Sequence, residues 1–149
     1  MSTRMGDDDT FLKVPDDLTG RTRPALTPET TAFWEGLARG QLILPRCRDC
    51  LRLNWISNAG CPWCGSEYAQ DEEVEAVGTV YTYTVAYRDF GVGMQAPYAP
   101  ARVALSAEPE LRLVTNIVNC RISDASIGMP VKGVFANAGT HGLLFFEPY

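Results

Sequence analysis

The chain has 149 residues, of which 46% are hydrophobic and 21% charged, a balance typical of one globular domain with at most a small appendage. Its formal net charge of -5 provides no overall positive field for a phosphate backbone, so nucleic acid is a disfavoured partner. No run approaches the ~18 apolar residues of a membrane-spanning helix, and the chain starts with acidic residues where a signal peptide would be basic. These features predict a cytoplasmic protein with reduced thiols and no membrane partner.

Residues 1–26 are rich in aspartate and proline and poor in apolar side chains, and they include the acidic triplet 7–9. This composition predicts a flexible acidic arm. The alternative is a strand-like tether that lies on a partner.

A helix is predicted over residues 27–40. Thr27 can cap its start, and Pro28 fits the first turn because the missing N–H would be unpaired there. Gly40 can end the helix in a left-handed conformation. The residues expected to share its apolar face are Phe33, Trp34, Leu37 and Ala38. We expect this element to be a docking helix.

Four of the five cysteines form two Cys-x-x-Cys pairs, and both pairs lie in the segment 41–73. Two residues between cysteines let both thiolates of a tight turn face one ion. Two such turns, joined by a hairpin with its own turn at 57–60, bring four sulfurs to about 2.3 Å from one Zn(II). The predicted ligands of this zinc ribbon are Cys47, Cys50, Cys61 and Cys64. Four thiolates leave no open position for water, so one structural zinc per chain is expected.

Three other chemistries compete for the same cysteines: a redox Cys-x-x-Cys, a pair of disulfides, and iron bound as in rubredoxin. A thioredoxin-type site requires one pair at the start of a helix and does not explain a second pair. The fifth cysteine, Cys120, ends an apolar strand and is interpreted as a small core residue.

Beyond residue 74 the pattern changes to short strands without a helix longer than one turn between them. The expected strands are 78–87, 101–106, 111–118, 131–136 and 143–147. They predict a mainly β fold with a small five-stranded antiparallel barrel over residues 74–149. Strict alternation in the first strand would place Tyr81, Tyr83 and Tyr87 on one face. Residues 107–110 are the expected turn of a hairpin.

Two further groups of residues carry weaker signals. Arg46, Arg48 and Arg52 surround the first cysteine pair, either as a solvated surface or as a patch for a phosphorylated ligand. His141, the single histidine, lies between glycines in a loop and is expected to be solvated. Nothing in the sequence places a nucleophile beside it, so no catalytic residue is predicted.

Five segments taken together resemble a known family. In chain order these are Phe33–Gly40, Arg46–Cys50, Cys61–Gly65, Gly78–Val85 and Ile127–Val131. Over roughly residues 27–149 this order resembles the zinc-ribbon plus OB-fold family known as domain of unknown function thirty-five (DUF35). The chain departs from the family at Leu51, where the first cysteine pair is usually followed by glycine.

The resemblance implies that the chain is a non-catalytic accessory subunit of an acyl-CoA enzyme. Partners in this family are thiolases, thiolase-like lyases, hydroxymethylglutaryl-CoA synthase or hydratases, and steroid side-chain lyases and aromatic acyl-CoA thiolases are possible settings. The partner carries the catalytic residues, and the OB-fold subunit docks on it and helps to form an acyl-CoA tunnel, where Arg46, Arg48 and Arg52 would contact the CoA phosphates. Two alternatives stay open: a module that binds single-stranded nucleic acid, and a stand-alone acyl-CoA-binding protein.

Overall fold

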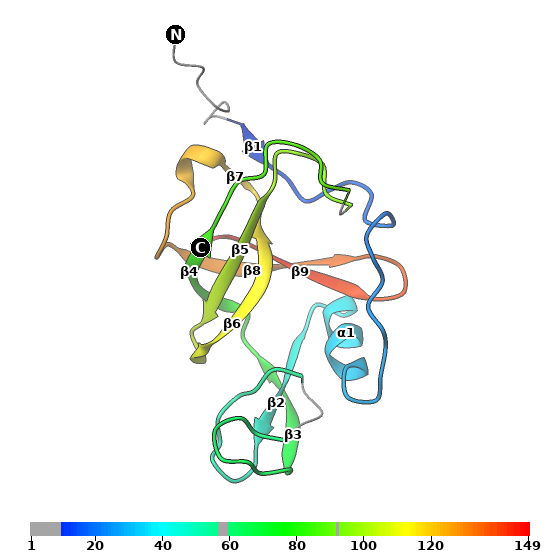
Figure 1. Cartoon of the computed structure of the whole chain (residues 1–149), viewed down its shortest axis with the longest axis vertical. Coiled ribbons are helices and arrows are strands. Elements are labelled where there is room, and N and C mark those ends of the chain that lie inside the picture. Colours follow the sequence, from blue (N-terminus) through cyan, green and yellow to red (C-terminus); the bar gives the residue numbers. More distant parts are fainter. Residues whose placement is uncertain (1–9, 57–59, 92) are drawn as a thin grey trace.

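The computed structural model describes residues 10–56, 60–91 and 93–149. It consists of a closed barrel with a two-stranded sheet at each end, and one helix lies beside the barrel (Figure 1). The barrel strands are β4 (Val77–Tyr83), β5 (Ala99–Leu105), β6 (Glu108–Ile117), β8 (Pro130–Asn137) and β9 (Gly142–Pro148), joined in the order β4-β5-β6-β9-β8. The predicted five-stranded barrel is therefore confirmed.

The prediction that the barrel is antiparallel throughout is wrong at one of its five junctions. Strands β6 and β9 run parallel, and they share a single ladder position, Ile117 opposite Phe146. The hydroxyl of Thr115 adds a second link, because it donates to the carbonyl oxygen of Leu144 at 2.8 Å. The other neighbouring strands pair antiparallel over several residues.

A β-bulge in β4 corrects the expected tyrosine stripe. Val80 pairs with Val103 and Thr82 pairs with Arg102, so Tyr81 is an extra residue without a partner of its own. The bulge reverses the alternation: Tyr81 is exposed, whereas Tyr83 turns toward the core and donates from its hydroxyl to the carbonyl of Ala125 at 2.9 Å. Tyr81 and Tyr83 therefore do not form one face.

The hairpin between β5 and β6 turns more tightly than predicted. Residues 106–107 form the turn, and Glu108–Glu110 already belong to β6. After the short strand β7 (Cys120–Arg121) comes a 3-10 turn, Ile122–Asp124.

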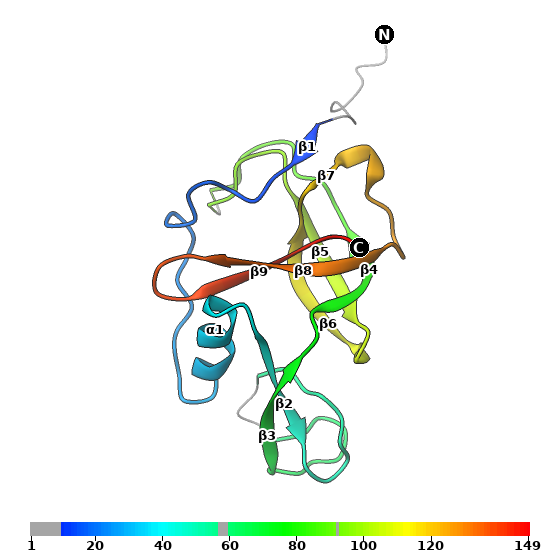
Figure 2. The same ribbon diagram turned by 180° about the vertical axis from the view of Figure 1, so that it is seen from behind.

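The zinc-ribbon segment is built on a hairpin that extends from one end of the barrel. Strand β2 (Leu42–Cys47) pairs antiparallel with β3 (Ala69–Val74), from Leu42 opposite Val74 to Cys47 opposite Ala69. Both views place this sheet at the end of the molecule away from β7 (Figures 1 and 2). The predicted turn at 57–60 lies outside the described residues except for Gly60.

Helix α1 (Thr31–Ala38) starts four residues later than predicted, and Thr30 rather than Thr27 precedes it. Gly40 has a φ of 76°, and the amide of Gln41 donates to the carbonyl of Gly36 at 2.8 Å, so the predicted glycine stop is confirmed. Ala38 is exposed, and the buried face is formed instead by Phe33, Gly36 and Leu37. The helix packs on β9, β2 and β8.

The prediction of a flexible arm over residues 1–26 is wrong where the chain attaches to the rest of the fold, at residues 11–12 and 18. The acidic triplet 7–9 lies outside the described residues. Strand β1 (Phe11–Leu12) pairs antiparallel with β7, and the side chains of Leu12 and Leu18 are buried. The overall composition of the segment does not predict this attachment, because it depends on only two leucines. None of the helices in the described part of the chain is long and apolar enough to span a membrane.

Candidate metal centre

The two Cys-x-x-Cys turns face each other at the end of the β2–β3 hairpin. The Sγ atoms of Cys47 and Cys64 are 3.6 Å apart, as are those of Cys50 and Cys61, and all four lie within 4.8 Å of one another. Four sulfurs bound to one zinc ion at about 2.3 Å stand roughly 3.8 Å apart. The cluster therefore has the size that a tetrahedral metal site requires.

The two turns repeat the same backbone pattern, which directs N–H groups at the sulfurs. In the first turn the amide of Leu51 donates to the carbonyl of Cys47 at 3.0 Å, and in the second the amide of Gly65 donates to the carbonyl of Cys61 at 2.8 Å. Leu51 and Gly65 both have positive φ, 66° and 78°. This conformation explains the glycine that the family usually carries after the first pair, since a leucine there is strained.

The amides within each turn set the pKa of the leading cysteine. The N–H of Cys50, helped by that of Asp49, lowers the pKa of Cys47. Burial alone would raise the pKa of Cys61, but the N–H groups of Cys64 and Trp63 outweigh it and bring the value to about 6. These backbone donors favour thiolates, the form in which cysteine binds a metal.

The trailing cysteine of the second pair behaves in the opposite way. The N–H of Ser66 acts to lower the pKa of Cys64, yet burial and the three other cysteines raise it to about 12. Four negative sulfurs cannot share so small a volume unless a cation lies among them. The chemistry of the donor set therefore fits a bound metal ion of the thiolate-preferring kind.

One residue beside the cluster was missed at the sequence level. Asn54 is buried, and its side-chain oxygen lies 3.8 Å from Sγ of Cys61. The amide of Asn54 also donates to the carbonyl of Pro45 at 2.8 Å, which fixes its place between the two cysteine turns. No periodic signal marks this residue, because the contact depends on how the hairpin closes.

All three arginines around the first pair have partners within the chain. Arg46 pairs with Glu72, and Arg48 donates to the side-chain oxygen of Gln70. Arg52 reaches from the ribbon to the barrel, where it pairs with Glu108 at 2.8 Å, and its guanidinium lies 3.4 Å from the ring centre of Trp63. Glu108 raises the pKa of Arg52. The geometry thus gives these arginines a structural role in holding the ribbon.

Profiles of two domains match this chain. The rubredoxin-like zinc ribbon domain of ChsH2 matches residues 34–69, and the C-terminal OB-fold domain of ChsH2 matches residues 71–136. A DUF35 domain-containing scaffold protein of Methanocaldococcus jannaschii is 37% identical over 98 residues, which are 63% of this chain and 67% of that protein. The chain belongs to the ChsH2/DUF35 family. The predicted zinc ribbon and OB-fold are confirmed.

Two other relatives carry the names of enzymes, and a third shares the fold. A probable enoyl-CoA hydratase alpha subunit of Thermomonospora curvata is 34% identical over 111 residues, 74% of this chain; the chain spans about a third of that relative's length, 34%. The solved structure of an Ltp2-ChsH2(DUF35) aldolase is 32% identical, with a TM-score of 0.75 over 85% of this chain and 98% of that one. A DUF35-family protein of Sulfolobus solfataricus, 19% identical with a TM-score of 0.59 over 82% of this chain and 86% of that one, shares the fold.

In this DUF35 chain, the expectation of a solvated His141 is wrong. The residue is 3% exposed, and its ring meets Trp34 of α1 edge to face with 5.7 Å between ring centres. Burial lowers the pKa of His141, and Arg23 and Arg21 lower it further, so the ring is neutral near pH 7. Nδ1 lies 3.1 Å from the hydroxyl of Thr140. Sequence could not reveal this burial, because the glycines around the residue are typical of an exposed loop.

Proposed function

We propose that this chain is a zinc-binding, non-catalytic subunit of an acyl-CoA enzyme complex, whose thiolase-like partner carries the catalytic residues. The observation that carries the proposal is the closed cluster of four sulfurs within a family that includes a named scaffold protein and a chain solved with Ltp2. A cluster that offers all four of its sulfurs to one ion has no position for substrate.

Zinc would be held by Cys47, Cys50, Cys61 and Cys64 and, when bound, would cross-link the two turns of the ribbon. The chain's own amides prepare this site, because they point at the sulfurs and stabilise thiolates there. Metal analysis of protein purified under reducing conditions should give one zinc per chain. Iron with a charge-transfer colour, or disulfides without metal, would contradict this part of the proposal.

We propose that the partner docks on the zinc ribbon, residues 41–73, together with the helical segment 27–40. Several large apolar side chains of the ribbon face solvent, namely Leu51, Trp55, Trp63 and Tyr68, and Tyr68 is 73% exposed. Exposed aromatic side chains that lie close together usually anchor an interface. The arginines are not needed for this contact, because Arg46 and Arg52 already pair with carboxylates.

Co-expression with a thiolase-like protein from the same genome tests the docking. The two proteins should co-purify as a heteromer, and Tyr68→Ala should weaken the association. Phe90→Ala is the matched control, since Phe90 is 57% exposed but lies outside the ribbon and should have no effect. If wild-type protein never co-purifies with such a partner, or both variants behave alike, the docking proposal fails.

The second candidate function is single-strand nucleic-acid binding, which the barrel fold favours. The β4 bulge argues against it, because it separates Tyr81 from Tyr83 and removes the stacking face that such binding uses. We expect negligible oligonucleotide binding near physiological salt. Submicromolar, salt-sensitive binding in a fluorescence anisotropy titration would reverse this ranking.

A further inference from the structure

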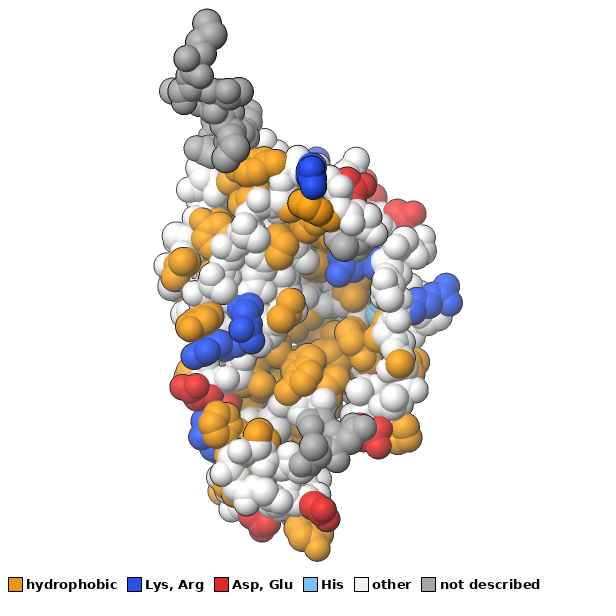
Figure 3. Space-filling model, in the orientation of Figure 1, with side chains coloured by type: hydrophobic (Ala, Val, Ile, Leu, Met, Phe, Trp, Pro, Cys, Tyr) orange, Lys and Arg blue, Asp and Glu red, His pale blue; other side chains and the backbone are white. Residues whose placement is uncertain are grey.

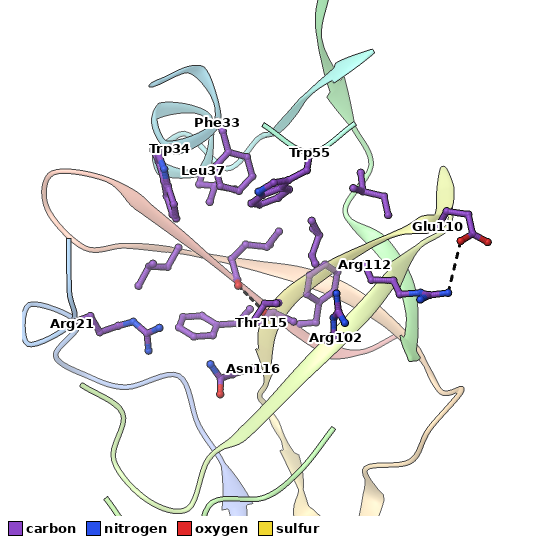
Figure 4. Close-up of a pocket in the computed structure, with 17 residues that line it drawn as sticks. Arg21, Phe33, Trp34, Leu37, Trp55, Arg102, Glu110, Arg112, Thr115 and Asn116 are labelled. Atoms are coloured by element: carbon purple, nitrogen blue, oxygen red, sulfur yellow. Dashed lines mark hydrogen bonds and ion pairs between the residues drawn. The ribbon is translucent and has the colours of Figure 1, made fainter. Parts of the chain in front are cut away.

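A cavity of about 600 Å³ opens where β6 and β9 part, and it is closed on another side by α1 and Trp55 (Figure 4). It lies where these strands share one ladder position, which the amide of Val118 supports by donating to the carbonyl of Phe146 at 2.8 Å. The hydroxyl of Thr115 adds the link to Leu144. The size of the cavity lies within the range of small-molecule binding sites. Trp55 is the one exposed ribbon aromatic that lines this cavity, and none of the four clustered cysteines lines it.

The walls of this cavity, which we call the groove, are mainly apolar. They include Phe33, Trp34 and Leu37 of α1 and Leu111, Leu113 and Leu144 of the barrel. Figure 3 shows hydrophobic side chains gathered in a hollow on this face, with basic side chains on both sides of it. Such a lining favours an apolar body, because burying that body removes it from water.

The polar groups of the groove are predominantly cationic and are incompletely satisfied. Arg21, Arg102 and Arg112 line it, and the single lining carboxylate, Glu110, approaches Arg112 only at 3.9 Å. In Figure 4, Arg21 points into the cavity from the side opposite Arg112, and Asn116 lies between them. In the described part of the chain, four buried side-chain polar atoms have no hydrogen-bond partner. Three of them lie in residues of this groove: Nη1 of Arg21, Nε of Arg112 and Oδ1 of Asn116.

Buried donors without partners are rare in native proteins and indicate a group that completes them. Two of the three atoms belong to guanidinium groups, which recognise carboxylates and phosphates. The Asn116 amide can turn so that its NH₂ group also donates. The groove therefore combines an apolar floor with donors that match an anion.

We propose that this groove is a binding site for a small amphipathic anion, whose apolar tail lies against α1 and the barrel leucines. Its carboxylate or phosphate head accepts a hydrogen bond from Arg112. The site goes beyond the scaffold function and does not depend on partner docking. All of the lining residues named here belong to this chain, so binding can be tested without a partner.

Dodecanoate, dodecyl phosphate and dodecanol share one tail and differ in the head, so together they test the site in the full-length wild-type protein. Trp34 and Trp55 line the groove, so tryptophan fluorescence reports occupancy, and calorimetry confirms the affinity. We expect at least one of the two anions to bind at least about tenfold more tightly than dodecanol, the difference expected of a charge-assisted hydrogen bond. The better anion identifies the head group. Equal affinity for dodecanol and both anions, or no binding of either anion, would overturn the proposal.

Arg112→Met tests the assigned donor. It should reduce the affinity for the preferred anion about tenfold and leave dodecanol binding unchanged. Arg88→Met is the matched control, because Arg88 is exposed, contacts Phe90 and lies outside the groove. Circular dichroism checks that both variants are folded, and the wild-type comparison of head groups stands without them. If the two variants weaken anion binding equally, the assignment of the groove is wrong.

Discussion

Leu51 has a left-handed backbone conformation directly after the first cysteine pair. Its φ is 66°, which costs a residue with a Cβ about 1–2 kcal/mol relative to the right-handed region. The side chain gives little in return, since it is 64% exposed. The turn keeps this conformation because the amide of Leu51 closes it on the carbonyl of Cys47.

Leu51→Gly should therefore stabilise the protein by roughly 0.5–1 kcal/mol, after the extra chain entropy of glycine in the unfolded state is subtracted. The free energy of unfolding, measured in denaturant at a fixed zinc concentration, gives the value. Leu26→Gly is the control, because Leu26 is also exposed but has no positive φ, and this change should be neutral or destabilising. A loss of stability in Leu51→Gly would show that the leucine contributes a contact that outweighs its strain.

Strand β1 has two residues, and one of them belongs to the core. Leu12 is 1% exposed and belongs to the main hydrophobic cluster, whereas its neighbour Phe11 is 48% exposed. Leu12→Ala should cost about 2–5 kcal/mol of unfolding free energy through lost burial and the cavity it leaves. Phe11→Ala removes a larger side chain from the same strand and should cost less than about 1 kcal/mol. Similar losses in the two variants would contradict the attachment of β1 to the barrel.

The contact of α1 with β9 depends on a glycine. A Cβ at Gly142 would stand 2.2 Å from the backbone of Leu37 and Ala38, so the helix cannot keep its position if any side chain is added. Gly142→Ala should destabilise the fold by about 3 kcal/mol or more, which thermal unfolding detects. Gly20→Ala is the control, since a Cβ there meets nothing within 4 Å, and its melting temperature should stay within a few degrees of wild type. An unchanged melting temperature for Gly142→Ala would place α1 elsewhere.

Elements specified by local pattern were predictable, and those specified by distant contacts were not. The Cys-x-x-Cys spacing sets the geometry of each turn. The alternation of apolar residues predicts the barrel strands, and Gly40 predicts the end of α1. The β4 bulge depends on pairing with β5, which lies beyond a long loop. The burial of His141 depends on Trp34, more than one hundred positions earlier in the chain. In both cases the contacting residues are too far apart in the chain for a short stretch of sequence to include them together.

At the scale of the whole molecule, the candidate metal cluster and the β1–β7 sheet occupy opposite ends, with the groove on the barrel between them (Figures 1 and 3). The ribbon is tied to the barrel by Arg52 and Glu108, which are 56 positions apart in the sequence. The exposed aromatic side chains at the ribbon end fit the docking surface proposed above. His141, the single histidine, is held between α1 and the β8–β9 connection and is not aligned with a nucleophilic cysteine.

Turnover of acyl-CoA thioesters tests the proposed function most directly. It is measured for the isolated chain, for a thiolase-like protein that co-purifies with it, and for the two expressed together. We predict no turnover by the isolated chain with its zinc bound, and activity in the combined preparation above that of the thiolase-like protein alone. Acyl transfer or cleavage by the isolated chain would contradict the account, as would full activity of the thiolase-like protein without it.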